Sequence, residues 1–169
     1  MPEHQWIEKR GNIAKRDILG CHKFSKWTRH SKPQHLMSSN GIITKTSNQG
    51  FEETYGKLRS IIENNPNLKI ILELDHAKNA ASVDLELNPT RIIMFGNPKL
   101  GTPLMNTTAY LGLDLPQKIL VTQGIDGSVQ VSYNDPLYLQ VRHKIEGVEE
   151  VLTKVKGALD KITNGAISA

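Results

Sequence analysis

Residues 89–103, PTRIIMFGNPKLGTP, indicate the fold class of this 169-residue chain. They begin as an apolar run rich in β-branched side chains and end in a segment with two glycines and two prolines. A buried strand that leads into a sharply turned loop has this pattern. Shortly before it, Asp75 and His76 are a polar pair at the end of a second strand-like segment. We expect a functional site where these two stretches meet.

The segments on either side predict a single α+β domain over residues 37–169. Asp126-Gly127 lies between two β-like runs, which is typical of a tight antiparallel hairpin. The predicted helices are too few to cover both faces of a parallel sheet. We therefore expect a mainly antiparallel five-stranded sheet with its helices on one face. The strands are predicted over residues 41–46, 68–75, 89–95, 117–122 and 128–133, and the helices over 51–62, 99–110, from 136 and from 148 to Asn164-Gly165.

Alternation in the second predicted strand suggests which of its faces is buried. Ile70, Leu72 and Leu74 share one side with His76, whereas Glu73 and Asp75 point to the other. We expect the apolar side to face the core. His76 would then end the apolar side, and Asp75 would not orient the imidazole, because adjacent strand residues point to opposite faces.

Charge divides the chain into a basic extension and a nearly neutral body. Residues 1–36 hold eight Lys/Arg and three Asp/Glu, a net charge of +5, whereas the remainder holds 13 basic and 14 acidic residues, a net charge of −1. We expect residues 1–36 to be a flexible extension. The alternatives are a basic arm that binds nucleic acid with Trp6, Phe24 and Trp27, or translation that starts at Met37. Cys21 and the nearby histidines fit no standard zinc-site spacing.

Several short motifs recur in the order and spacing of a known family. They are LDHA at 74–77, PTR at 89–91, FGNP at 95–98, GTPLM at 101–105, Leu115-Pro116, Tyr133 and Asp135-Pro136. Together they resemble the family catalogued as domain of unknown function 302, over residues 40–163. The resemblance implies a β-α-β4-α fold like the TATA-binding-protein superfold, usually as a homodimer. It implies no agreed activity.

The candidate site residues lie in the two stretches described first. We predict a ligand pocket between His76 and residues 95–105, lined by His76, Phe95, Gly96, Asn97, Gly101, Thr102 and Met105. The glycine-rich loop could also offer backbone N–H groups to an anion, although Pro98 and Pro103 remove two donors. His76 is the candidate general acid/base, and the imidazole of His76 is also the one weak candidate for a metal ligand. The residues point to no cofactor, and His143 is a possible companion of His76.

Three functions follow from these residues. The first is a dimeric small-molecule- or metal-binding accessory domain that uses the predicted pocket. The second is an enzyme in which His76 acts on an anionic substrate held by loop amides. The third is a nucleic-acid binder that uses the basic extension. We expect a cytoplasmic protein with no membrane association, because there is one cysteine and no apolar run of membrane-spanning length.

Overall fold

The structure is a computed structural model and describes residues 40–169. The predictions for residues 1–36, including the nucleic-acid arm and the role of Cys21, lie outside the described residues. Met37 as a start of translation lies outside them as well.

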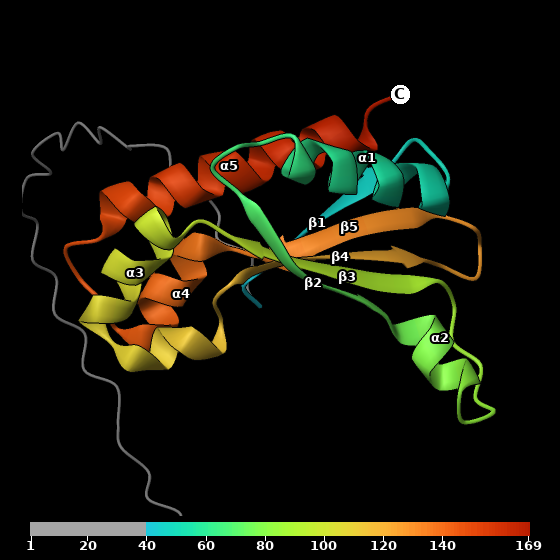
Figure 1. Cartoon of the computed structure of the whole chain (residues 1–169), viewed down its shortest axis with the longest axis horizontal. Coiled ribbons are helices and arrows are strands. Elements are labelled where there is room, and N and C mark those ends of the chain that lie inside the picture. Colours follow the sequence, from blue (N-terminus) through green and yellow to red (C-terminus); the bar gives the residue numbers. More distant parts are fainter. Residues whose placement is uncertain (1–39) are drawn as a thin grey trace, which may run out of the picture. The chain divides into compact units, whose positions relative to one another are not determined.

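Five strands form one antiparallel sheet in the order β1-β5-β4-β3-β2 (Figure 1). The predicted hairpin joins β4 to β5, and Gly127 adopts a φ of 82° in its turn, which glycine tolerates without strain. The α+β class and the antiparallel sheet are confirmed. The strands are β1 (Ile42–Ser47), β2 (Lys69–Asp75), β3 (Thr90–Gly96), β4 (Gln117–Gln123) and β5 (Val129–Asn134).

The two long helices, α1 (Phe51–Glu63) and α5 (Glu149–Ile167), lie together on one face of the sheet (Figure 1). The short helix α2 (His76–Ala81) lies at one end of the sheet. At the other end lie α3 (Pro98–Thr107), the 3-10 turn η1 (Ala109–Leu113) and α4 (Pro136–His143). Among residues 40–169, no helix has the length and apolarity needed to cross a membrane.

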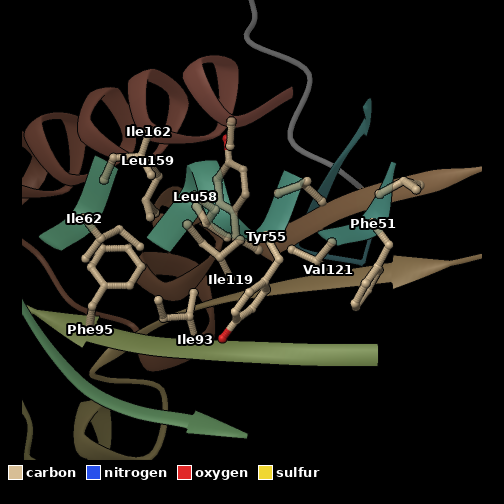
Figure 2. Close-up of a cluster of buried hydrophobic side chains, with 14 of the residues drawn as sticks. Phe51, Tyr55, Leu58, Ile62, Ile93, Phe95, Ile119, Val121, Leu159 and Ile162 are labelled. Carbon is tan, nitrogen blue, oxygen red and sulfur yellow. The ribbon is translucent and has the colours of Figure 1, made fainter. Parts of the chain in front are cut away.

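The main core lies between the sheet and the two long helices (Figure 2). Spacings of three and four residues along α1 and α5 place their apolar side chains on one stripe, and alternation along β3 and β4 places theirs on one face. Figure 2 shows Phe51 and Phe95 at opposite ends of this cluster. A second, smaller buried cluster joins α3, η1, α4 and the start of α5. The labelled members of the main core are Phe51, Tyr55, Leu58, Ile62, Ile93, Phe95, Ile119, Val121, Leu159 and Ile162.

The predicted burial of β2 is wrong beyond Ile70. A register irregularity between Ile70 and Leu72 adds one residue to β2 relative to β3, and such a bulge reverses the faces of the residues after it. Ile70 therefore packs against the core, whereas Leu72 and Leu74 lie on the side without long helices. Glu73 turns towards α1, where it accepts a hydrogen bond from Tyr55 at 2.7 Å.

Helix α5 extends past the predicted stop at Asn164-Gly165, to Ile167. Gly165 instead allows α1 and α5 to approach each other. A Cβ atom built at Gly165 would lie 2.9 Å from Cδ1 of Ile61. The glycine reflects close helix packing at this point, which local sequence signals do not distinguish from a helix end.

An apolar strip lies on the sheet face that the long helices leave uncovered. Cross-strand pairing aligns Leu74 with Ile92 and Leu120, and aligns Leu72 with Met94. These five residues alternate with the core residues of the same strands. We call these five residues the open-face strip. Among them, Leu72 has a relative exposure of 47%.

Candidate ligand-binding site

A pocket of about 320 Å³ lies at the end of the sheet where β3 leads into α3. Phe95 and Gly96 end the strand, and Asn97 starts the turn into the helix. Helix α5 supplies the wall across from them through Val155, Ala158, Leu159 and Ile162. A volume of this size is at the lower end of the range for small-molecule sites.

Every predicted site residue of the 95–105 segment lines this pocket, namely Phe95, Gly96, Asn97, Gly101, Thr102 and Met105. The start of β2, η1 and the start of β4 complete the wall. Most of these side chains are apolar, and Lys69 is the one charged residue among them. The additional lining residues are Leu68, Lys69, Ile71, Pro98, Leu100, Leu104, Gly112, Leu115, Pro116 and Gln117.

The turn from β3 into α3 is closed by its own hydrogen bonds. The side-chain oxygen of Asn97 accepts from the N–H of Lys99 at 3.0 Å, and its carbonyl accepts from the N–H groups of Leu100 and Gly101. Pro98 contributes no N–H to the first turn. The N–H groups of Lys99, Leu100 and Gly101 are therefore already engaged and are not free to hold an anion. The enzyme hypothesis loses its predicted anion-binding element.

His76 does not take part in the pocket, so the predicted site between His76 and residues 95–105 is wrong. In the β2–β3 pair, Lys69 lies opposite Gly96, whereas Asp75 lies opposite Arg91. The two ends of this pair are separated by the length of the strands. His76 begins α2 at the far end of the sheet (Figure 1). Antiparallel pairing separates the two stretches that we expected to meet.

Asp75 serves as a cap and an ion-pair partner rather than as a companion of His76. Its Oδ1 atom accepts from the N–H of Lys78 at 3.0 Å at the start of α2, and Oδ2 accepts from Nε of Arg91 at 2.8 Å. The hydrogen bond from Lys78, followed by that from Arg91, lowers the pKa of the Asp75 carboxyl. The expectation that Asp75 does not orient the imidazole of His76 is confirmed.

His143 is the last residue of α4 and pairs with Asp114, not with His76. Its Nε2 atom lies 2.5 Å from Oδ2 of Asp114, and Arg142 binds Oδ1 of the same carboxylate at 3.0 Å. The side chains of His143 and Asp114 are 8% and 7% exposed. No sequence signal indicated this pair, because Asp114 and His143 lie on separate elements. The pair links the end of η1 to α4.

Within residues 40–169, no group of three or more His, Cys, Asp or Glu side chains could hold a metal ion. His76 therefore belongs to no set of three or more candidate ligands in this part of the chain. Sequence reasoning also missed that α5 forms one wall of the pocket. Val155, Leu159 and Ile162 form a helical stripe that predicts burial, but a stripe does not reveal whether the space opposite is filled.

Comparison with known proteins gives related sequences and a related structure. Residues 43–162 match the family model described as Domain of unknown function DUF302. The "Fluoride-specific ion channel FluC 1" of Brucella suis biovar 1 is 31% identical over 122 residues, and the "Fluoride-specific ion channel FluC 2" of Brucella melitensis biotype 1 has the same identity over the same length. The match covers 72% of this chain but only 48% and 45% of those two proteins. The chain thus spans about half the length of the curated relatives it matches.

A solved structure supports the fold. The uncharacterised conserved protein DUF302 from Bacillus stearothermophilus superposes with a TM-score of 0.66 at 17% sequence identity. The superposition covers 75% of this chain and 98% of that one. The sequence match extends over most of the sheet and helices described above. The chain therefore belongs to the DUF302 family.

Proposed function

We propose that this protein is a small binding domain that holds an apolar ligand in the pocket between α3 and α5. One observation carries the proposal: most of the residues that line the pocket are apolar, and they surround a volume of about 320 Å³. Apolar lining with a few polar groups at the rim is the usual composition of a ligand site. We expect the domain to act in the cytoplasm, in keeping with its single cysteine.

The open-face strip supports a homodimer as the form in which the domain works. Leu72, Leu74, Ile92, Met94 and Leu120 form a continuous apolar area on the face that α1 and α5 leave uncovered. Contiguous exposed apolar surface is characteristic of interaction sites. The pocket lies at the end of the sheet, so ligand and partner would use different surfaces.

Calorimetric titration with 1-octanol as the probe tests pocket binding. Ala158 is an exposed α5 residue that lines the pocket, so Ala158→Phe should fill the site without disturbing the core. Thr153→Phe is the matched control, because Thr153 is an exposed α5 residue that does not line the pocket. We expect wild type and Thr153→Phe to bind the alcohol and Ala158→Phe to lose binding at least tenfold.

Two results would reject the proposal. One is equal affinity of Ala158→Phe and wild type, which would locate any binding elsewhere on the molecule. The other is no measurable heat for any alcohol from hexanol to decanol. Circular dichroism of each variant should match wild type and so show that the substitutions leave the fold intact.

A second candidate function is that of an accessory domain for a membrane channel. It rests on the names of the curated relatives, in which the similar region is 45–48% of a longer protein named as a fluoride-specific ion channel. We infer that this domain modulates such a channel. Fluoride efflux from vesicles that contain a fluoride channel, measured with and without this protein, tests the idea. Unchanged efflux would reject it.

The other two hypotheses have no support from the described residues. For an enzyme that uses His76, neither a companion metal ligand nor an anion-binding loop lies beside the imidazole in residues 40–169. Nucleic-acid binding through residues 1–36 stays a prediction, because those residues lie outside the description. A protein that starts at Met37 should lose salt-dependent binding if the basic extension is responsible.

A further inference from the structure

The geometry points to an amphipathic anion as the ligand of the pocket: a single apolar chain inside, with an anionic head group at Lys69. This inference rests on the proposed function, because it specifies the ligand of the same site. It goes further in assigning a role to Lys69 and a chemical class to the ligand.

Within residues 40–169, Lys69 is the only ionisable residue that lines the pocket. It lies at the first position of β2, directly across from Gly96, where the sheet ends and the pocket opens. The residue is exposed, so its side chain is accessible to a ligand that enters the pocket. A charged group at the mouth of an apolar cavity selects among ligands by the sign of their head group.

The ammonium group of Lys69 has no partner in the described part of the chain. Several other lysines of the domain are engaged: for example, Lys45 binds Asp160 at 3.0 Å, and Lys118 donates to the carbonyl of Asp114 at 2.9 Å. Among residues 40–169, no carboxylate lines the pocket, so none of the described acidic groups there opposes a bound anion. An anion at this position would gain an ion pair without displacing an existing one.

Gln117 offers a second polar group on the lining. It is the first residue of β4, pairs with Phe95 across the sheet, and its side-chain amide makes no hydrogen bond within residues 40–169. An amide N–H can donate to a carboxylate beside a lysine ammonium group. The remaining lining is apolar and fits a hydrocarbon chain, for which affinity should rise about fourfold per buried methylene.

The test compares three probes with the same eight-carbon chain and different head groups: sodium octanoate, 1-octanol and octyltrimethylammonium. Calorimetry at low salt should show octanoate binding about two- to fivefold tighter than the alcohol, the range expected for an ion pair near the surface. The cation should bind more weakly than the alcohol. Added salt should reduce the difference between octanoate and the alcohol.

Lys69→Glu should reverse this order, so that octanoate binds more weakly than the alcohol. Lys99→Glu is the matched control: Lys99 is an exposed lysine on α3 whose ammonium group has no partner within residues 40–169, and it is next to lining residues but not part of the lining. It changes the net charge by the same amount and should leave the order of the probes unchanged. Ala158→Phe should abolish binding of octanoate.

The outcomes distinguish the head-group assignment to Lys69 from the proposed apolar pocket. Equal binding of octanoate and 1-octanol to wild type, or equal effects of Lys69→Glu and Lys99→Glu, would overturn the head-group assignment and leave the apolar pocket intact. Absence of binding by all three probes would overturn the proposed function as well. Octanoate binding that survives Ala158→Phe would place the anion outside the pocket and overturn the inference.

Discussion

Arg91 connects three elements through two carboxylates and two aromatic rings. From β3 it binds Asp75 at the end of β2 and both side-chain oxygens of Glu52 on α1, each at 2.8 Å. Its guanidinium carbon also lies 5.2 Å and 5.4 Å from the ring centroids of Phe51 and Tyr55. A planar guanidinium suits this combination of paired and stacked contacts. Arg91 therefore holds α1 against the β2 edge, at the end of the sheet away from the pocket.

Asp75→Asn tests this arrangement through the dependence of stability on pH. Asparagine keeps the helix cap but removes the negative charge, so the variant should lose about 1 kcal/mol at pH 7. The pKa of Asp75 is lowered in the folded state by the N–H of Lys78 and then by Arg91. Its stabilisation is therefore fully present above the unfolded pKa of about 4 and is lost as pH falls through the folded pKa.

Urea denaturation of wild type and Asp75→Asn at pH 7 and below pH 3 measures this dependence. The difference in unfolding free energy should shrink at the lower pH. A difference that stays constant across that range would show that the charge of Asp75 does not stabilise the fold.

Removal of the Asp114 carboxylate should destabilise the protein more than removal of an exposed one. Asp114→Ala leaves the buried imidazole of His143 without its partner at 2.5 Å, which should cost about 2–3 kcal/mol. Glu146→Ala, at an exposed carboxylate near the same helix, should change stability by less than about 0.5 kcal/mol. Equal effects in urea denaturation would contradict a structural role for the pair.

At the scale of elements, the junction between β1 and α4 depends on a glycine. Gly41 has a φ of 70°, and a Cβ atom there would overlap the ring of Tyr138 on α4. Gly147 has a similar φ of 74° but nothing within 4 Å of its Cβ position. Both glycines have a positive φ, but only Gly41 also lies in close contact with another side chain.

Gly41→Ala should therefore cost about 2–4 kcal/mol, the sum of backbone strain and overpacking. Gly147→Ala should cost about 1 kcal/mol from backbone strain alone. Chemical denaturation of the two variants gives the comparison. A similar loss in both would contradict the close contact between Gly41 and Tyr138.

Most elements could be predicted because their signals are local. The Asp126-Gly127 turn, the stripe along α1 and the alternation of β5 each depend on residues close in sequence. The faces of β2 could not be predicted, because the irregularity between Ile70 and Leu72 shifts the alternation without a glycine or proline to mark it.

Only one part of the candidate site could be predicted from the sequence, namely the wall that residues 95–105 form. Residues 95–105 form one wall because they are a continuous strand, turn and helix. The α5 wall depends on long-range packing, and the placement of His76 depends on strand direction. The pair of His143 and Asp114 could not be predicted either, because its partners are 29 positions apart and meet only through long-range packing.

For the whole molecule, the open-face strip predicts self-association. Leu72→Glu places a charge in the strip at a position that is 47% exposed, so it should weaken a dimer without unfolding the protomer. Ile125→Glu is the matched control, because Ile125 is 99% exposed in the hairpin turn and outside the strip. Light scattering should give a dimer for wild type and Ile125→Glu and a monomer for Leu72→Glu. A monomeric wild type at high concentration would contradict the prediction.

The whole-molecule arrangement also separates two regions that the sequence suggested were one. The pocket lies where β3 meets α3. Helix α2, which begins at His76, lies at the other end of the sheet from α3 (Figure 1). His76→Ala should consequently leave ligand affinity unchanged. This substitution serves as the distant control for the pocket.

Backbone amide NMR during titration with 1-octanol tests the central claim most directly, because it reports where the ligand binds. Three glycines of the lining, Gly96, Gly101 and Gly112, should shift with a common dissociation constant, in wild type and in His76→Ala alike. Gly124 and Gly147, outside the lining, should not shift. Shifts confined to α2 and the neighbouring end of the sheet, or no saturable shifts in the lining glycines, would contradict the pocket as the binding site.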